Sequence, residues 1–495
     1  MILNRRTFLT GAGAGLLLAG RDLHADQAAK GPLPVLPLSD LTGLDPDIIP
    51  LRLAASTHDF GTGERSTTFG INADYLGPVL QVKSGQTLPF AVENGLDEPV
   101  ALHWHGLHIP GHVDGGPHQE IAPGDVWRPD VPIRQRSSMT WFHSHTHGRT
   151  ARQVYHGLAG VLLIEDDASL AADLPQTYGV DDFTLILQDK AFDEAGRLTY
   201  ELTGEVFEDG FEAETLVVNG AIAPVMQNVP AGLVRLRILN ACNARFLDLS
   251  LSNSEALTVI ASDGGFLASA VETATLTISP GERYEVLIDL STSENVTLQV
   301  TFSEGEAEGL AILTQPIFGD PKMAALILNR DPSLKAFDGS MPKALANLAP
   351  PRETDALRSR DFELNMGDEG QLAALAEAWG NFCGEGGMGI NGQPMQMERI
   401  DVKVTIGELE IWRISADDMQ HPFHIHGCSF RILRQYGDEP PAYAQGWKDM
   451  VAVQDGVSEV LVRFDHKADE TTPFMYHCHI LEHEDCGMMG QFTVS

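Results

Sequence analysis

The stretch Val82-Lys-Ser-Gly85, followed by Thr87-Leu-Pro-Phe-Ala-Val-Glu-Asn94, decides the fold of this chain because variants of it occur twice more. The second copy joins Val229-Pro-Ala-Gly232 to Leu233-Val-Arg-Leu-Arg-Ile-Leu-Asn240, and the third joins Val404-Thr-Ile-Gly407 to Glu408-Leu-Glu-Ile-Trp-Arg-Ile414. In each copy a turn glycine precedes apolar residues at every second position, which is typical of a half-buried β-strand. Three such units predict an all-β chain of three repeated β-sandwich domains.

The composition agrees with this fold class. The chain has 495 residues, of which 43% are hydrophobic and 21% charged, and it contains 48 glycines and 28 prolines. Such a length corresponds to about three domains, and the many turn residues favour β structure. The connectors between the repeats place the first domain at residues 47–167, the second at 180–316, a linker at 317–355 and the third at 356–495.

The charge and the N-terminus restrict the partners and the location of the protein. The formal net charge of −36 gives a surface that repels nucleic acid and anionic lipid. Arg5 and Arg6 precede an apolar run at residues 11–20, which is shorter than the roughly 20 residues that span a bilayer. This pattern predicts a twin-arginine export signal at residues 1–25. We therefore expect a periplasmic monomer with no membrane anchor and no nucleic-acid partner.

One strand after the turn glycine, the three copies differ in chemistry. The first and third copies hold a pair of histidines there, and the second holds a pair of leucines. The pairs, each 17 to 20 residues after the glycine, are His103 and His105, His424 and His426, and Leu249 and Leu251. The middle unit keeps the strand pattern but lacks the imidazoles. The comparison predicts a metal site shared by the first and last domains, with the middle domain as a spacer.

Ten of the 18 histidines lie in four short motifs. The motifs are His103-Trp-His105-Gly, His143-Ser-His145, His421-Pro-Phe-His424-Ile-His426-Gly and His477-Cys478-His479-Ile-Leu-Glu-His483. Residues i and i+2 of a strand point to the same face, so each His-x-His pair projects two imidazoles together. Eight imidazoles in four pairs suit three metal ions. Imidazole suits copper, zinc, iron and nickel alike, so these pairs alone do not name the metal.

The last motif narrows the choice of metal. Cys478 points to the face opposite its two neighbouring histidines, so its thiolate can bind a different ion. His421 and His483 can complete that site, with Met488 as a weak axial ligand. Two histidines, a thiolate and a distant methionine form a blue-copper electron-transfer site. One peptide unit then connects the thiolate to an imidazole on either side.

These motifs resemble the three-domain multicopper oxidases, in particular the bacterial copper-efflux oxidase and laccase-like branch. The resemblance covers nearly the whole chain after the signal and implies three cupredoxin-like Greek-key domains and four copper ions. Beyond the histidine motifs it includes Val113-Asp114-Gly115-Gly116-Pro117, Trp141-Phe142, His147-Gly148, Gly157-Leu158-Ala159-Gly160, Gly446-Trp447-Lys448-Asp449 and Glu482-His483-Glu484-Asp485-Cys486-Gly487-Met488-Met489. The implied ligands are His421, Cys478, His483 and Met488 for type 1 copper, His103 and His424 for type 2, and His105, His143, His145, His426, His477 and His479 for the type 3 pair.

The resemblance also implies an activity: one-electron oxidation of phenols, aromatic amines or cuprous ion, coupled to four-electron reduction of dioxygen to water. Asp114 and Glu484 match positions that assist proton delivery in the family. Asp417 and Met419 match residues that bind a cuprous substrate ion in the copper-efflux branch. That branch has a methionine-rich insertion, whereas residues 367–392 of this chain contain only Met388.

Several alternatives remain open at this point. The protein could be mainly a cuprous oxidase in periplasmic copper tolerance, or a copper-binding protein without turnover. A copper nitrite reductase would not need eight imidazoles in four pairs. A copper-free scaffold, such as the cell-division relatives that keep this fold, would have lost ligands, and none is lost here.

The cysteines predict little disulfide bonding. Apart from Cys478, we expect Cys242, Cys383, Cys428 and Cys486 to be small buried residues in preference to bridges, although an oxidising compartment permits a bridge.

Overall fold

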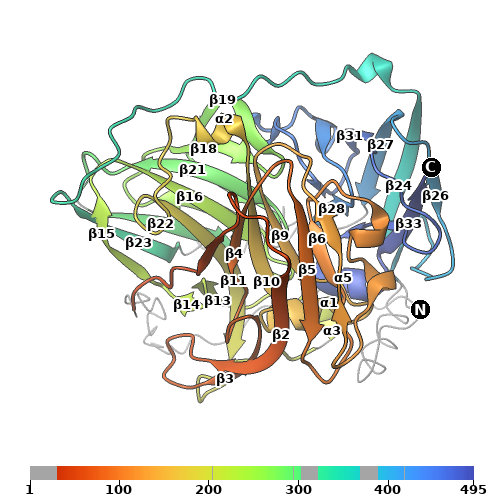
Figure 1. The fold of residues 1–495 in the computed structure, drawn as a ribbon, viewed down its shortest axis with the longest axis horizontal. Coiled ribbons are helices and arrows are strands. Elements are labelled where there is room, and N and C mark those ends of the chain that lie inside the picture. The colour runs from red at the N-terminus through yellow and green to blue at the C-terminus, as the bar shows by residue number, and fades with distance from the viewer. Residues whose placement is uncertain (1–30, 203, 294, 303–321, 368–387, 417–418) are drawn as a thin grey trace, which may run out of the picture.

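Strands make up most of the regular structure in the computed structural model of the chain (Figure 1). It describes residues 31–495 except 203, 294, 303–321, 368–387 and 417–418, so the predicted export signal lies outside the described residues. The α-helices of the described residues are short: α1 (Thr150–Tyr155), α2 (Asp167–Leu170), α3 (Gly204–Asp209) and α5 (Leu481–Asp485). Among the described residues, none of the helices combines the length and apolar character needed to cross a membrane.

The first domain is a sandwich of two five-stranded sheets. One sheet has the order β1 (Leu38–Asp40), β4 (Val79–Lys83), β10 (Ala159–Glu165), β9 (Ser138–Ser144) and β6 (Leu102–His105). The other has the order β3 (Ser66–Ile71), β2 (Ile49–His58), β5 (Thr87–Asn94) and β7 (Val126–Trp127), and β8 (Asp130–Pro132) also pairs with β5. Short 3-10 turns, η1 (Gly111–Val113) and η2 (Pro117–Gln119), follow β6.

The middle domain has a larger sheet of eight strands facing one of five. The larger has the order β14 (Ala221–Ile222), β13 (Thr215–Val218), β11 (Asp182–Phe192), β16 (Leu233–Asn240), β21 (Arg283–Asp289), β18 (Leu257–Ser262) and β19 (Gly265–Thr273), and β12 (Leu198–Thr199) also pairs with β11. The smaller has the order β15 (Val225–Pro230), β23 (Met323–Asp331), β22 (Asn295–Phe302), β17 (Leu247–Leu251) and β20 (Leu276–Ile278).

The third domain repeats the first, with two five-stranded sheets. One has the order β25 (Gly389–Ile390), β24 (Arg358–Asn365), β27 (Leu409–Ala416), β31 (Ser458–Arg463) and β29 (Phe430–Arg434). The other has the order β26 (Val402–Val404), β33 (Met489–Val494), β32 (Phe474–Cys478), β28 (His421–Ile425) and β30 (Met450–Val453). The 3-10 turns η4 (Glu353–Asp355) and η5 (Ala442–Ala444) precede β24 and β30.

The three-fold repeat that the sequence predicted is present in the strand pairing. The three predicted strands are β5, β16 and β27, and each runs parallel to the first long strand of its domain, β2, β11 or β24. The next strand after each is β6, β17 or β28. On β17, Leu249 and Leu251 are buried in the core of the middle domain. The all-β prediction, with three cupredoxin-like Greek-key sandwiches, is confirmed.

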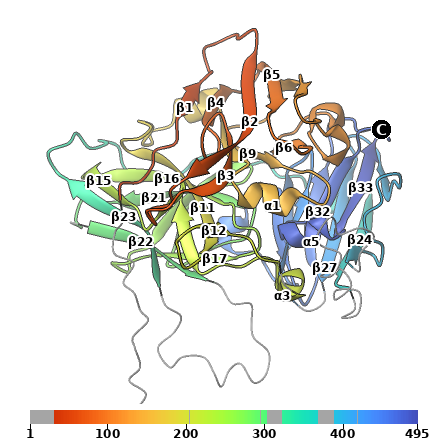
Figure 2. The same ribbon diagram turned by 90° about the horizontal axis from the view of Figure 1, so that it is seen from below.

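The first domain contacts both of the others, and the middle and third domains also contact each other directly. In Figure 1 its strands (red to orange) stand at the centre, with the middle domain (green) on one side and the third (blue) on the other. Figure 2 shows helix α1 of the first domain side by side with helix α5 of the third. A separate apolar cluster, which includes Trp141 and Leu239, joins the first and middle domains. The seam between the first and third domains is where the histidine motifs meet.

The cysteine prediction is wrong at one position. Cys242, Cys428 and Cys478 are buried free thiols, as expected. Cys486 is disulfide-bonded, and Cys383 lies outside the described residues. Because spacing alone does not specify disulfide connectivity, the sequence could not identify this bridge.

Candidate metal centre

Four adjacent strands position the eight paired imidazoles. Strand β6 carries His103 and His105, and it pairs with β9 so that His103 lies opposite His143. In the third domain, β28 pairs with β32 so that His424 lies opposite His477. The second member of three pairs stands one residue beyond the strand end. All eight imidazoles are buried; they belong to His103, His105, His143, His145, His424, His426, His477 and His479.

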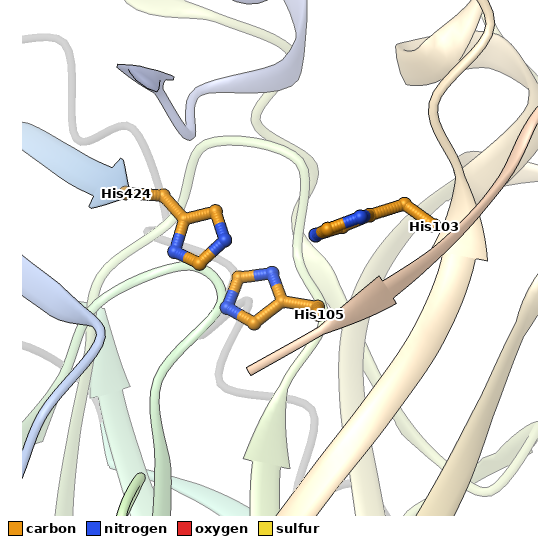
Figure 3. A group of neighbouring side chains, drawn as sticks. All are labelled: His103, His105 and His424. Carbon is orange, nitrogen blue, oxygen red and sulfur yellow. The ribbon is translucent and has the colours of Figure 1, made fainter. Parts of the chain in front are cut away.

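The ring nitrogens form compact groups at the domain seam. In each group the nitrogen atoms lie within 4.8 Å of one another; the groups are His105, His143 and His479, then His145, His426 and His477, and then His103, His105 and His424. Figure 3 shows the last group, with the two residues from β6 facing the one from β28. Every group combines ligands from the first and third domains, as the sequence predicted.

The distances within these groups fit metal coordination. The nitrogen pairs His143 Nε2 with His105 Nδ1 and His145 Nε2 with His477 Nε2 are 3.4 Å and 3.3 Å apart. Nitrogen ligands at about 2.0–2.1 Å from one ion stand roughly 3.3–3.6 Å from each other. In addition, the buried Nε2 atoms of His103, His424 and His479 have no hydrogen-bond partner among the described residues. A buried nitrogen without a partner is costly, and a bound cation removes that cost.

The opposite ring nitrogen of several imidazoles is held by a backbone carbonyl. His103 Nδ1 donates to Asp114 O at 3.0 Å, and His424 Nδ1 donates to Asp449 O at 2.8 Å. His143 makes the same type of bond to Ser144 O at 2.8 Å. A carbonyl only accepts, so the ring proton is on Nδ1 and the Nε2 lone pair faces the cluster.

Burial keeps these imidazoles neutral. It lowers the pKa of His105, His143, His424 and His426 well below the ordinary value, with a further lowering from neighbouring imidazoles. It lowers the pKa of His145 and His479 to about 3. At neutral pH all six rings therefore present a lone pair and not a second proton, which is the form that binds metal.

A second group lies on the other side of strand β32. Cys478 Sγ is 3.4 Å from His421 Nδ1 and 3.8 Å from His483 Nδ1, and the two nitrogens are 3.3 Å apart. His483 Nε2 donates to the carbonyl of Glu208 at 3.0 Å, which directs its Nδ1 at the sulfur. Met488 is fully buried in the same core cluster, and its carbonyl accepts from Cys478 N at 3.1 Å. The donor set of two imidazoles and one thiolate suits copper.

Both predicted carboxylates contact the imidazole cluster. Asp114 Oδ2 accepts a hydrogen bond of 2.7 Å from His426 Nδ1. Glu484 places its two oxygens 3.3 Å from His145 Nδ1 and 3.1 Å from His477 Nδ1. Each acid is nearly inaccessible to solvent. The two acids reach the cluster from the first and third domains respectively.

The predicted cuprous-ion residues are only partly visible. Asp417 lies outside the described residues. Met419 is half-buried and packs against the core of the third domain. The structure therefore does not bring these two residues together as a described site.

The middle domain makes a contribution to the site that the sequence pattern does not predict. The guanidinium of Arg283, on β21, makes two hydrogen bonds to the Asp449 carboxylate: Nη1 donates to Oδ1 and Nη2 donates to Oδ2, each at 2.6 Å. Asp449 Oδ1 in turn lies 3.2 Å from His105 Nε2. The middle domain is therefore not merely a spacer, because it fixes a carboxylate that contacts a cluster histidine. Asp449 stood in a quoted motif, whereas nothing in the strand pattern marked Arg283.

The ion pair between Arg283 and Asp449 explains the glycine in His103-Trp-His105-Gly106. Gly106 has φ +85°, and a Cβ there would stand 2.7 Å from both Arg283 Nη2 and Asp449 Oδ2. We expect Gly106→Ala to lower the free energy of unfolding and to reduce the copper bound after loading. Gly85→Ala is the matched control, because Gly85 has φ +103° with nothing within 4 Å of the added Cβ.

Both variants share the backbone cost of a left-handed residue, about 1–2 kcal/mol. The overpacking in Gly106→Ala adds about 1–3 kcal/mol, measurable by denaturant titration. Equal losses of stability in the two variants would contradict the close packing at Gly106.

Comparisons with known proteins agree with this geometry. Residues 53–169, 164–313 and 363–495 each match a domain family described as multicopper oxidase. The chain is 37% identical to the cell division protein FtsP of Sodalis glossinidius over 100% of this chain and 99% of that one. It is 36% identical to the FtsP of Escherichia coli K12, again over 100% and 99%.

Solved structures give the same family. A laccase-like multicopper oxidase CueO from the lignin-degrading bacterium Ochrobactrum sp., with oxidase activity towards lignin model compounds and lignosulfonate, is 41% identical with a TM-score of 0.84, over 94% of this chain and 100% of that one. A metallo-oxidase from Campylobacter jejuni is 26% identical with a TM-score of 0.78, over 94% and 95%. With three matching domains, a shared fold and paired imidazoles at the seam, the chain belongs to the multicopper oxidase family.

Proposed function

We propose that this protein is an exported four-copper oxidase that couples one-electron oxidation of small substrates to the reduction of dioxygen to water. The proposal rests on the arrangement at strand β32. There Cys478 belongs to the thiolate group with His421 and His483, whereas its neighbour His477 belongs to an imidazole group. We assign the type 1 ion to His421, Cys478, His483 and Met488, the type 2 ion to His103 and His424, and the type 3 pair to His105, His143, His145, His426, His477 and His479. Bound copper would supply one-electron redox chemistry and the binding of dioxygen.

The chain itself provides a short connection between the two sites. The Cys478 carbonyl accepts a hydrogen bond of 2.8 Å from His477 Nδ1. A through-bond route of one peptide unit and a parallel hydrogen bond therefore both join the thiolate residue to the imidazole cluster. His479 is the covalent neighbour on the other side. No mobile carrier is needed between the two sites.

Asp114 and Glu484 are placed to pass protons beside the cluster. Burial raises the pKa of Glu484, but His145 and His477 lower it by more, so Glu484 would receive a proton only in passing. Reduction of dioxygen to water consumes four protons as well as four electrons, and buried carboxylates near the reacting oxygen can supply them. Asp114 Oδ1 has no hydrogen-bond partner among the described residues, whereas its Oδ2 is bonded to His426. One oxygen can therefore orient the imidazole while the other takes up and releases a proton.

We expect Asp114→Asn to leave the visible colour of the copper-loaded protein intact and to slow oxygen consumption by about a hundredfold. The amide oxygen can still accept from His426, but the side chain can no longer carry a proton. Oxygen uptake under saturating phenol is the measurement, with copper per chain as the control. Unchanged turnover would remove Asp114 from proton delivery.

The surroundings of His421 favour small aromatic substrates. A cleft of about 540 Å³ is lined by Gln420, the residue before His421, and by Tyr436 and Tyr443. Its lining also carries Glu282, Asp438 and Asp455 and no lysine or arginine. Acidic and aromatic walls suit phenols and, in particular, cationic aromatic amines. Cuprous ion stays a second candidate substrate, because Met419 lies beside Gln420.

The decisive experiment is to load the purified protein with copper and to measure its oxygen uptake with a dimethoxyphenol and with cuprous ion. Uptake with either substrate, at about four coppers per chain, supports the oxidase. A second candidate function, in cell division, is suggested by the names of the FtsP relatives. Protein that stays colourless and binds far fewer ions would favour such a non-catalytic role.

A further inference from the structure

A basic cleft stands out on this acidic protein. The chain has a formal charge of −36, and the cleft beside Gln420 has only acids among its charged lining residues. A different cleft of about 500 Å³ has three arginines and one aspartate in its lining. Its polar lining includes His108, Arg134, Arg136, Trp447, Arg463 and His466. We call it the basic cleft.

Arg136 has no partner of opposite charge among the described residues. Its guanidinium lies over the ring of Trp447, 4.9 Å from the ring centre. Within the described part of the chain, no ion pair or side-chain hydrogen bond involves this guanidinium. The carboxylate that acts on it electrostatically is Asp166, whose oxygens instead accept from the backbone amides of Ser137 and Ser169, at 3.0 Å and 2.8 Å.

A second arginine, Arg431, also lacks an ion pair in the part of the chain that the structure describes. Arg431, on β29, lies opposite Leu461, which lines the basic cleft. Its Nε atom is buried and has no hydrogen-bond partner in the described structure. Burial lowers the pKa of Arg431, and the nearby charge of Arg136 lowers it further. The positive charges of Arg136 and Arg431 thus act on each other, and neither guanidinium has an ion pair among the described residues.

The remaining polar groups leave this positive charge uncompensated. Arg134 donates to the carbonyls of Gln86 and Ile133, which carry no charge. Arg463 is paired with Asp465 at 2.9 Å and 3.0 Å, so that aspartate is already occupied. Trp447 Nε1 is a buried donor with no acceptor among the described residues.

We propose that the basic cleft binds a small oxyanion that carries phosphate or carboxylate groups. Partly buried like charges repel each other and lose hydration, and an anion between them removes both costs. The guanidinium fork matches phosphate and carboxylate oxygens, and Trp447 Nε1 offers one further donor. The proposal is independent of the oxidase function, because none of these residues is an assigned copper ligand.

The position of the basic cleft connects it to the metal centre. Its lining includes Gly427, Cys428 and Ser429, which directly follow His426. Ser429 Oγ lies 2.7 Å from His108 Nε2, and His108 is three residues beyond His105. A bound anion therefore spans the two loops that follow cluster histidines in the first and third domains. Binding should hold these loops together and raise thermal stability.

Calorimetric titration of the copper-loaded full chain tests the proposal. Inorganic phosphate and succinate are titrated separately, each at an ionic strength matched with chloride, so that the two arms distinguish phosphate from carboxylate ligands. We expect one site per chain and an affinity at least about tenfold weaker in Arg431→Gln. Arg434→Gln is the matched control, because Arg434 is on the same strand but is exposed and paired with Glu459.

Each outcome decides the proposal. Binding of phosphate, succinate or both, weakened in Arg431→Gln and preserved in Arg434→Gln, supports it and identifies the ligand chemistry. Absence of saturable binding of either probe, or equal affinity in all three proteins, overturns it. Thermal unfolding without either probe checks the variant itself, since losing an unpaired cation should not lower the unfolding temperature of Arg431→Gln.

Discussion

Replacing Cys478 by serine is expected to abolish the intense visible colour of the copper-loaded protein and to remove one copper ion per chain. The sulfur is the only thiolate in its ligand group, 3.4 Å and 3.8 Å from the two imidazole nitrogens. A serine hydroxyl is a hard, neutral donor and does not replace a soft thiolate for copper. Mutation of a residue that only supports a metal ligand lowers metal affinity or activity by up to about a hundredfold. Because Cys478 is itself a proposed ligand, we expect its replacement to lower the rate of substrate oxidation by more than about a hundredfold.

Cys428→Ser provides the matched control for this experiment. Cys428 is also a buried free thiol of the third domain, but among the described residues its Sγ bonds only to the carbonyl of Ile425, at 3.7 Å. We expect this variant to keep its colour, its copper and its turnover. Metal analysis, visible absorption and oxygen uptake together separate loss of the ligand from general damage to the core. A Cys478→Ser protein that keeps its colour would refute the assignment of the type 1 site.

The second large effect is expected at Arg283, the cation that the middle domain places behind the cluster. Arg283→Met should lower the free energy of unfolding by about 3–5 kcal/mol, the usual cost of breaking a buried ion pair. The substitution leaves Asp449 buried without its bidentate partner, and Asp263, whose carboxylate lies 3.7 Å from Arg283 Nη1, loses a nearby positive charge. Asp449 then no longer holds a fixed position beside His105, so copper binding should weaken as well.

Arg235→Met is the control that separates loss of stability from loss of copper binding. Arg235 lies on β16 of the same sheet, and its Nε donates to the buried Glu285 at 2.8 Å, but it contacts no cluster histidine. Its loss should destabilise the chain to a similar degree and leave copper content unchanged. The double variant Arg283→Met with Asp449→Leu should regain part of the stability but not the copper affinity. Equal copper retention in both single variants would show that Arg283 serves stability alone.

The strand framework could be predicted because it rests on local periodicity. Alternating apolar residues after a turn glycine identified β5, β16 and β27, and the residue spacing then located the histidine pairs on β6 and β28. The opposite directions of Cys478 and His477 also follow from the two-residue period of a strand. These features depend on residues close together in the sequence.

The parts that escaped prediction depend on contacts between distant residues. Arg283 and Asp449 are 166 positions apart in the sequence. From the sequence alone, a charged residue in a strand of the middle domain is expected to be exposed to solvent. The disulfide at Cys486 and the basic cleft could not be predicted for the same reason. Periodicity assigns a side chain to a face of its own sheet and does not say which other domain will cover that face. The predicted domain boundaries stay predictions.

The order of the ligands along the chain has a consequence for biosynthesis. Two of the three imidazole groups, completed by His479 and His477, and the thiolate group each include at least one residue between positions 477 and 483. A ribosome must therefore translate past position 477 before any of these three groups is complete. A product that ends before that position would carry the early histidines without the late ones. Resistance to proteolysis gained on copper addition would thus report that synthesis had passed these late ligands.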